Sequence, residues 1–189
     1  MEKIITSKVR QNLNEHTARI ILERSDKLAS STLEQLRKST DRAYTIMGFL
    51  LTVFVALTAY VASMPPLALL SIAITMWIGI GIATYIMFSK VIWVHSFRHT
   101  GNDPRNMIQE ANIDVLAKKY DFAKLNERYS LHTLLDAISI NQSIIDRNRE
   151  ILEQRCNHIE TAMTVIKCSI MLSTLITVVS LLVSIFLTW

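Results

Sequence analysis

Hydrophobic side chains are concentrated in two stretches of this chain that contain no Asp, Glu, Lys, Arg or His. One stretch covers residues 43–89 and the other covers residues 168–189. A helix needs about 20 apolar residues to cross the roughly 30 Å hydrocarbon layer of a membrane. The first stretch is therefore long enough for two crossings, and Met64-Pro65-Pro66 is its only strong helix breaker. The pattern predicts three transmembrane helices, at about residues 44–63, 67–89 and 168–188.

The rest of the chain is also expected to be helical, because its periodic segments have helical spacing and none alternates over the length of a strand. The predicted fold class is all-α: an integral membrane helical bundle with three transmembrane helices and helical cytoplasmic extensions. Ser31 and Glu34 form a capping-box pattern, which predicts the start of the helix that leads into the first span. The predicted regions are N-terminal cytoplasmic helices, a transmembrane hairpin, a cytoplasmic helical region and a C-terminal transmembrane helix, over residues 1–42, 43–90, 91–166 and 167–189.

Lysine and arginine side chains are distributed unequally along the chain. Residues 1–42 and 90–167 are rich in them, whereas the turn at residues 64–66 and the C-terminal residues 188–189 contain none. Because cytoplasmic segments next to membrane spans carry an excess of Lys and Arg, we expect the N-terminus inside and the C-terminus outside. No secretory signal peptide is expected, since a long charged segment precedes the first apolar stretch.

One face of the segment before the last predicted span is apolar. Its residues recur at spacings of three, four or seven, as in a helix-packing seam, and include Ile145, Leu152, Ile159, Met163 and Ile166. In the span the register continues with hydroxyl side chains, at Ser173, Thr177, Ser180 and Ser184. Helices in lipid associate through small residues and hydrogen bonds, so this hydroxyl stripe either packs against other helices or lines a passage in an oligomer. We expect one helix over about residues 131–188, with a break near Asn157 as the alternative.

Few residues suggest catalysis or metal binding. Arg10 and His16 are separated by five residues; in such a pair, Arg would hold a phosphate group and His would transfer a proton. His95 and His99 share one helical face at the cytoplasmic end of the second span. They supply at most half of a tetrahedral zinc site, and the alternative is an interfacial histidine cluster or a pH-sensitive ring.

Several functional classes are disfavoured by what the sequence lacks. No predicted span has an ionisable side chain in its middle, which argues against proton relays and charge-coupled transport. The sequence has no glycine-rich phosphate loop and no recognisable nucleophile–base arrangement. We therefore expect no enzyme activity, no cofactor and no bound metal.

This organisation is similar to that of small membrane proteins of bacterial anti-phage systems. The charge-free hairpin with helical flanks, over about residues 30–130, resembles the SLATT-type two-span effectors, although the third span is a departure from their plan. The spacing of Arg10 and His16 resembles the HEPN ribonuclease motif. On a membrane protein of this size it is similar to the HEPN-motif accessory pore protein of type VI-B CRISPR systems.

The resemblance implies a homo-oligomeric pore or effector that permeabilises or depolarises the bacterial inner membrane in antiviral defence. The partners would be other copies of the chain, the lipid bilayer and a cytoplasmic defence protein or nucleic-acid-linked signal. Two alternatives stay open: a non-conducting membrane scaffold or regulatory subunit, and a membrane-anchored HEPN-like ribonuclease that uses Arg10 and His16.

Overall fold

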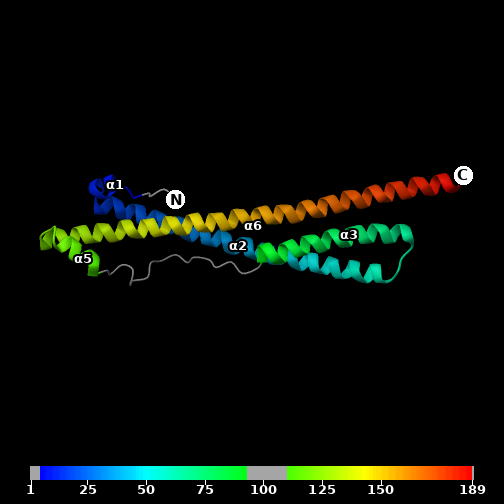
Figure 1. Ribbon diagram of the computed structural model, residues 1–189, viewed down its shortest axis with the longest axis horizontal. Coiled ribbons are helices and arrows are strands. Elements are labelled where there is room, and N and C mark those ends of the chain that lie inside the picture. The colour runs from blue at the N-terminus through cyan, green and yellow to red at the C-terminus, as the bar shows by residue number, and fades with distance from the viewer. Residues whose placement is uncertain (1–4, 93–109, 189) are drawn as a thin grey trace. The chain divides into compact units, whose positions relative to one another are not determined.

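The computed structural model describes residues 5–92 and 110–188, and every regular element in these two ranges is a helix (Figure 1). This confirms the predicted all-α class. The elements, in chain order, are α1 (Ser7–Asn12), α2 (Glu15–Ala62), α3 (Leu67–Ile86), the π-helical segment η1 (Met87–Ile92), α5 (Glu110–Ala117) and α6 (Phe122–Thr188).

Three helical segments are long and apolar enough to cross a membrane, as predicted; they are Glu15–Ala62, Leu67–Ile92 and Lys124–Phe186. The turn between the first two of these segments lies at the position predicted from Pro65 and Pro66, because α2 ends at Ala62 and α3 begins at Leu67. In this turn Met64 adopts a left-handed backbone conformation, with φ of 50°.

Two predictions about helix continuity have opposite outcomes. The expectation of one continuous last helix is confirmed, since α6 has no break at Asn157, and it begins earlier than expected, at Phe122. The prediction of a helix start at Ser31 is wrong, because α2 runs unbroken from Glu15 through this position. Helix propagation adds one hydrogen bond for each residue that it fixes, so a weak capping pattern inside a good helical sequence does not interrupt it.

The chain divides into two compact units, each of which contains part of α2 and part of α6. We call Met1–Leu36 with Ser96–Glu150 the polar unit, and Arg37–His95 with Ile151–Trp189 the apolar unit. The polar unit contains α1, α5 and the N-terminal parts of α2 and α6; the apolar unit contains α3, η1 and the C-terminal parts.

The core of the polar unit forms where α1 and α2 pack on α6. Its buried side chains are Ala18, Leu131, Leu135 and Ile138 in one cluster, and Ala29, Ile144 and Ile145 in another. Val9 and Leu13, on and just after α1, pack against the first cluster. The short helix α1 is therefore held mainly by tertiary packing, because an isolated helix of this length is not stable in water.

Helices α2 and α6 run parallel within the polar unit. In the polar unit, Ser130 donates a hydrogen bond to Glu15, 115 residues earlier. In the same unit, Asn141 donates one to Asp26, again 115 residues earlier. A constant offset along both helices is the mark of a parallel pair, since in an antiparallel pair the difference would change at each turn.

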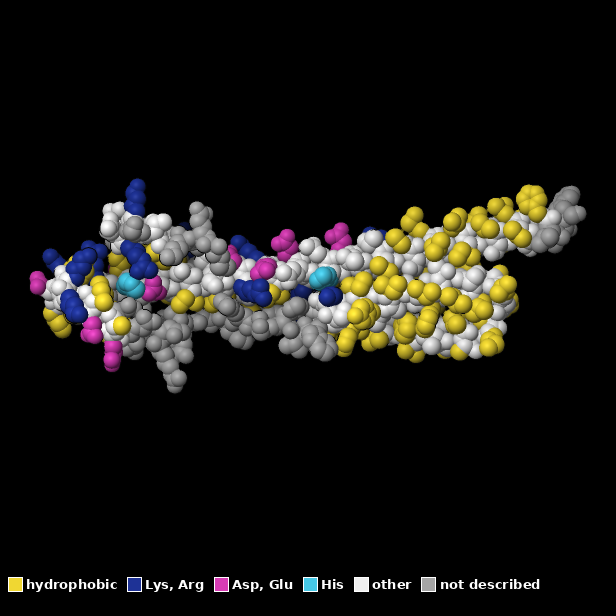
Figure 2. Space-filling view, viewed as in Figure 1, with side chains coloured by type: hydrophobic (Ala, Val, Ile, Leu, Met, Phe, Trp, Pro, Cys, Tyr) yellow, Lys and Arg dark blue, Asp and Glu magenta, His cyan; other side chains and the backbone are white. Residues whose placement is uncertain are grey.

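The core of the apolar unit is a three-helix contact among α2, α3 with η1, and α6. Its buried residues are Ala43, Met47, Leu50, Ile80, Ala83, Met87, Val91 and Ala162. Many large apolar side chains remain exposed on this unit, and Figure 2 shows hydrophobic side chains spread over its visible surface. A water-soluble protein rarely exposes a continuous apolar surface of this kind, so the surface suits a lipid environment.

Close helix contacts hold α3 in place between its neighbours. A Cβ atom added to Gly79 would overlap Ser169 Oγ and lie 2.5 Å from Ser169 Cβ, so the glycine permits the approach of α3 to α6. Towards α2, the rings of Phe54 and Trp77 stack at 5.5 Å, and Trp77 Nε1 donates a hydrogen bond of 2.8 Å to Thr58.

Candidate functional site

The polar unit contains a pocket of about 240 Å³ formed by three helical segments. This pocket is lined by side chains from α1, from the end of α5 and the turn after it, and from the first turns of α6. They are Arg10, Gln11, Leu116, Tyr120, Arg128, Leu131, His132 and Leu135. The lining thus combines two guanidinium groups and an imidazole with three leucines.

Arg10, His132 and Asp136 form a closed triangle of polar contacts beside the pocket. Arg10 Nη1 lies 2.8 Å from His132 Nε2, and Arg10 Nη2 donates to Asp136 Oδ1 at 3.2 Å. His132 Nδ1 lies 3.0 Å from Asp136 Oδ2. Because arginine can only donate, His132 Nε2 must accept, and the imidazole proton is then on Nδ1, where it faces Asp136.

This triangle includes Arg10 of the predicted motif but not His16. His16 lies exposed in the first turn of α2, whereas the hydrogen bonds of Arg10 go to His132 and Asp136 on α6. Neither partner of Arg10 was predicted from the sequence. The spacing of His132 and Asp136 by one helical turn was a signal for a pair on one face, but nothing local links that pair to Arg10, 122 residues earlier.

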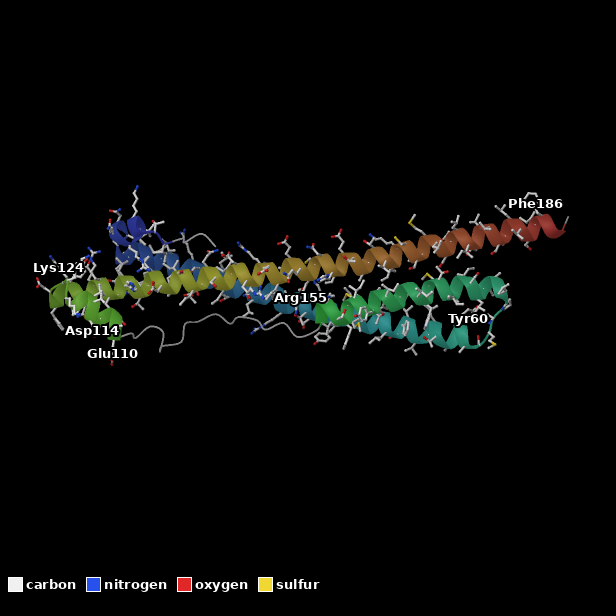
Figure 3. The ribbon with its side chains drawn as sticks, viewed as in Figure 1. Tyr60, Glu110, Asp114, Lys124, Arg155 and Phe186 are labelled. Carbon is white, nitrogen blue, oxygen red and sulfur yellow. The ribbon has the colours of Figure 1, made fainter. Side chains whose placement is uncertain are left out.

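Basic side chains surround the aromatic ring at the pocket. Lys119 Nζ lies 5.6 Å from the centroid of the Tyr120 ring, and Arg128 Cζ lies 5.8 Å from it. Both distances are within the range of cation–π attraction. Figure 3 shows the nearby Lys124 at the start of α6 and two acidic side chains, Glu110 and Asp114, on α5; these three side chains are exposed.

Most residues of the predicted seam pack inside one chain. Ile145 is 1% exposed in the core of the polar unit, and Ile159 and Ile166 pack against the core cluster of the apolar unit. Leu152 is half-buried and Met163 is exposed. In the single chain this face of α6 therefore binds the chain's own helices, and its predicted use between copies stays a prediction.

The hydroxyl stripe changes its surroundings along α6. Ser173 is buried and Thr177 half-buried; both line an apolar pocket of about 350 Å³ with Ile72 and Met76 of α3. Ser180 is half-buried and Ser184 is exposed. The first half of the stripe thus faces α3 in the single chain, and its role in an oligomer stays a prediction.

Three polar residues of α6, spaced seven apart and lying between residues of the seam, are buried, and this was not predicted from the sequence. Asn141 donates hydrogen bonds to Ser25 Oγ (2.9 Å) and Asp26 Oδ1 (2.6 Å) on α2. Asn148 is 0% exposed, and neither of its amide atoms has a hydrogen-bond partner among the described residues. Arg155 is 3% exposed, donates to Thr40 at 2.7 Å, and is labelled on α6 in Figure 3. Burial lowers the pKa of its guanidinium group.

The predicted histidine pair, His95 and His99, lies outside the described residues. Within the described ranges, no group of three or more His, Cys, Asp or Glu side chains is arranged to hold a metal ion. Cys156 and Cys168 are both free thiols, and both are exposed. The geometry therefore identifies the pocket around Arg10 and His132 as the candidate site.

Comparisons with known proteins add no relative to this picture. The chain matches no family model, and no curated protein or solved structure is significantly similar to it. The features of the chain that bear on its function are the pocket in the polar unit and the exposed apolar surface of the other unit.

Proposed function

We propose that this protein is a membrane effector that self-associates in the bilayer and makes it permeable under the control of its polar helices. The observation that carries the proposal is the continuity of α2 and α6, each of which runs without a break through the polar unit and the apolar unit. We therefore expect a change in the packing of either helix in the polar unit to act on the same helix in the apolar unit.

Insertion of the predicted spans of the apolar unit, at about residues 44–63, 67–89 and 168–188, into a lipid bilayer is part of this proposal. Its three helices satisfy their own backbone hydrogen bonds, as every spanning segment in lipid must. Large side chains such as Leu175, Val179 and Leu182 are each at least half exposed, and in a bilayer they would contact acyl chains rather than water. The charge distribution supports an orientation with the N-terminus in the cytoplasm of a bacterium and the C-terminus outside.

Self-association is supported by the last turns of α6. From Leu181 to Phe186 every side chain is exposed on all faces of the helix, and Ser184 is among them. Lipid gives helices no hydrophobic reason to associate, so small and hydroxyl side chains on such a surface favour contact with another helix. A ring of copies that contact through α6 would place part of the hydroxyl stripe at its centre.

The proposal is tested by ion flux from liposomes that contain the purified full-length chain. We expect flux to increase with the amount of inserted protein, and Thr177→Leu to reduce it by tenfold or more without preventing insertion. Thr52→Leu, the same change at an exposed position of α2, is the matched control and should leave flux unchanged. Absence of flux from liposomes with confirmed insertion would overturn the proposal.

A non-conducting scaffold is the second candidate, and one observation favours it. Ser173 and Thr177 face Ile72 and Met76 within the chain, so the stripe has a packing role that requires no passage. In that case the protein inserts, no flux appears, and the polar unit holds a cytoplasmic partner. The flux measurement therefore separates the two candidates. The ribonuclease alternative stays a prediction, since the contacts of Arg10 with His132 and Asp136 are those of a single chain.

A further inference from the structure

We infer that the pocket formed by α1, α5 and α6 in the polar unit binds a small phosphorylated ligand of no more than about mononucleotide size, with Arg10 and Arg128 contacting its phosphate group. The inference concerns ligand binding alone and does not depend on whether the apolar unit conducts ions.

The side chains that line the pocket carry positive charge. Two guanidinium groups, Arg10 and Arg128, line the pocket, and no carboxylate does. Asp136 is paired with Arg10 and His132 but is not part of the lining. The arrangement leaves a net positive pocket, which attracts an anion in proportion to the anion's own charge.

Both arginines have N–H donors that their contacts with described residues leave unused. A guanidinium group has five N–H donors, and the contacts of Arg10 to His132 and Asp136 use two of them. Arg128 makes a cation–π contact with Tyr120, and it forms no ion pair with any residue in the described ranges. Two guanidinium groups match a phosphomonoester, which carries two charges and several oxygens, better than they match a ligand with a single carboxylate.

The size and the walls of the pocket limit the rest of the ligand. A volume of about 240 Å³ is below the usual range for drug-sized ligands, roughly 300–1,000 Å³, so the occupant is compact. Leu116, Leu131 and Leu135 form an apolar wall beside Tyr120. An apolar or planar group attached to the phosphate would contact that wall, which inorganic phosphate alone leaves unused.

Binding would also join three segments of the polar unit. Arg10 and Gln11 come from α1, Tyr120 from the turn after α5, and Arg128 from α6. A phosphate shared by Arg10 and Arg128 adds a bridge between α1 and α6 to the one that His132 and Asp136 already make. The ligand would thus stabilise the position of α1, the shortest α-helix in the described part of the chain.

Calorimetric titration of the purified full-length chain in detergent tests the inference, with inorganic phosphate and adenosine 5′-monophosphate as probes. We expect saturable binding of the nucleotide with a Kd below about 1 mM, which is about 4 kcal/mol of binding free energy, and weaker binding of phosphate. Arg128→Gln should weaken nucleotide binding at least tenfold, and Arg128→Lys, which keeps the charge, should weaken it less.

Arg149→Gln is the matched control, because Arg149 is an exposed arginine on the same helix that does not line the pocket. Its nucleotide affinity should equal that of the unchanged chain, and circular dichroism should show equal helix content in all variants. Three results would each overturn the inference: no saturable binding of either probe, an equal loss of affinity in the Arg149 variant, or a nucleotide that binds no tighter than phosphate.

Discussion

Helix α6 packs on its neighbours through different side chains in the two units. In the polar unit, buried isoleucines alternate along α6 with the amides Asn141 and Asn148. In the apolar unit, the corresponding positions of α6 after Arg155 are Ala162 and Ser169, which are small.

The difference follows from what each solvent rewards. In water, burying apolar side chains drives helix association, and a polar residue in the seam costs stability but fixes the register of a parallel pair. In lipid, burial offers no such gain, so association depends on close packing of small residues. If the apolar unit inserts into a bilayer as proposed, each part of α6 has the side chains that suit its surroundings.

Removing the space between α3 and α6 should have the largest effect. Gly79→Ala places a Cβ atom against Ser169, and overpacking of this kind costs about 1–3 kcal/mol of unfolding free energy. Gly48→Ala is the control, because nothing lies within 4 Å of a Cβ atom at Gly48 and alanine is the better helix former. Thermal unfolding in detergent should show a lower midpoint for the Gly79 variant only. Equal midpoints for the two variants would contradict the close contact.

The two asparagines of the polar unit should respond in opposite directions to the same substitution. Asn141→Leu leaves Ser25 and Asp26 without their donor and should lower the unfolding free energy by about 1–2 kcal/mol. Asn148→Leu replaces a buried amide that has no described partner, so it should raise the unfolding free energy by up to about 1 kcal/mol. Denaturant unfolding of both variants provides the measurement, and two changes of the same sign would show that Asn148 is not an unsatisfied group.

The smallest effect is expected at the surface of the polar unit. The pKa of Glu23 is lowered by its hydrogen bond and charge interaction with Lys27, on a fully exposed helix face. A lowered folded-state pKa stabilises the fold above the unfolded-state pKa, and that contribution is lost as the pH falls through the folded value. Glu23→Gln should thus lower the unfolding midpoint slightly at pH 7 and leave it unchanged at pH 3. A difference that grows on acidification would reverse this sign.

Local sequence signals predicted the parts of the fold that depend on local composition. The apolar stretches, the break at Met64-Pro65-Pro66 and the unbroken α6 all follow from hydropathy and helix propensity within a few turns. The wrong prediction of a helix start at Ser31 shows that a capping pattern does not begin a helix when the residues before it are already helical. The π-helical segment at Met87–Ile92 had no signal of its own in the sequence.

The candidate pocket could not be predicted in the same way, because its residues come from three segments. Arg10 and His132 are 122 positions apart, and their contact depends on how α1 packs on α6. The buried amides Asn141 and Asn148 were not predicted for a different reason. The seam was defined by its apolar residues alone, and this pattern does not show which polar residues between them are buried.

Electron microscopy of the purified full-length chain in lipid nanodiscs tests most directly the central claim, that this protein assembles in a bilayer to form a passage. The account predicts a closed ring of copies with a central opening and with α6 of each copy at the contact between neighbours. Single copies or dimers without an opening, in nanodiscs where insertion is confirmed, would contradict the claim.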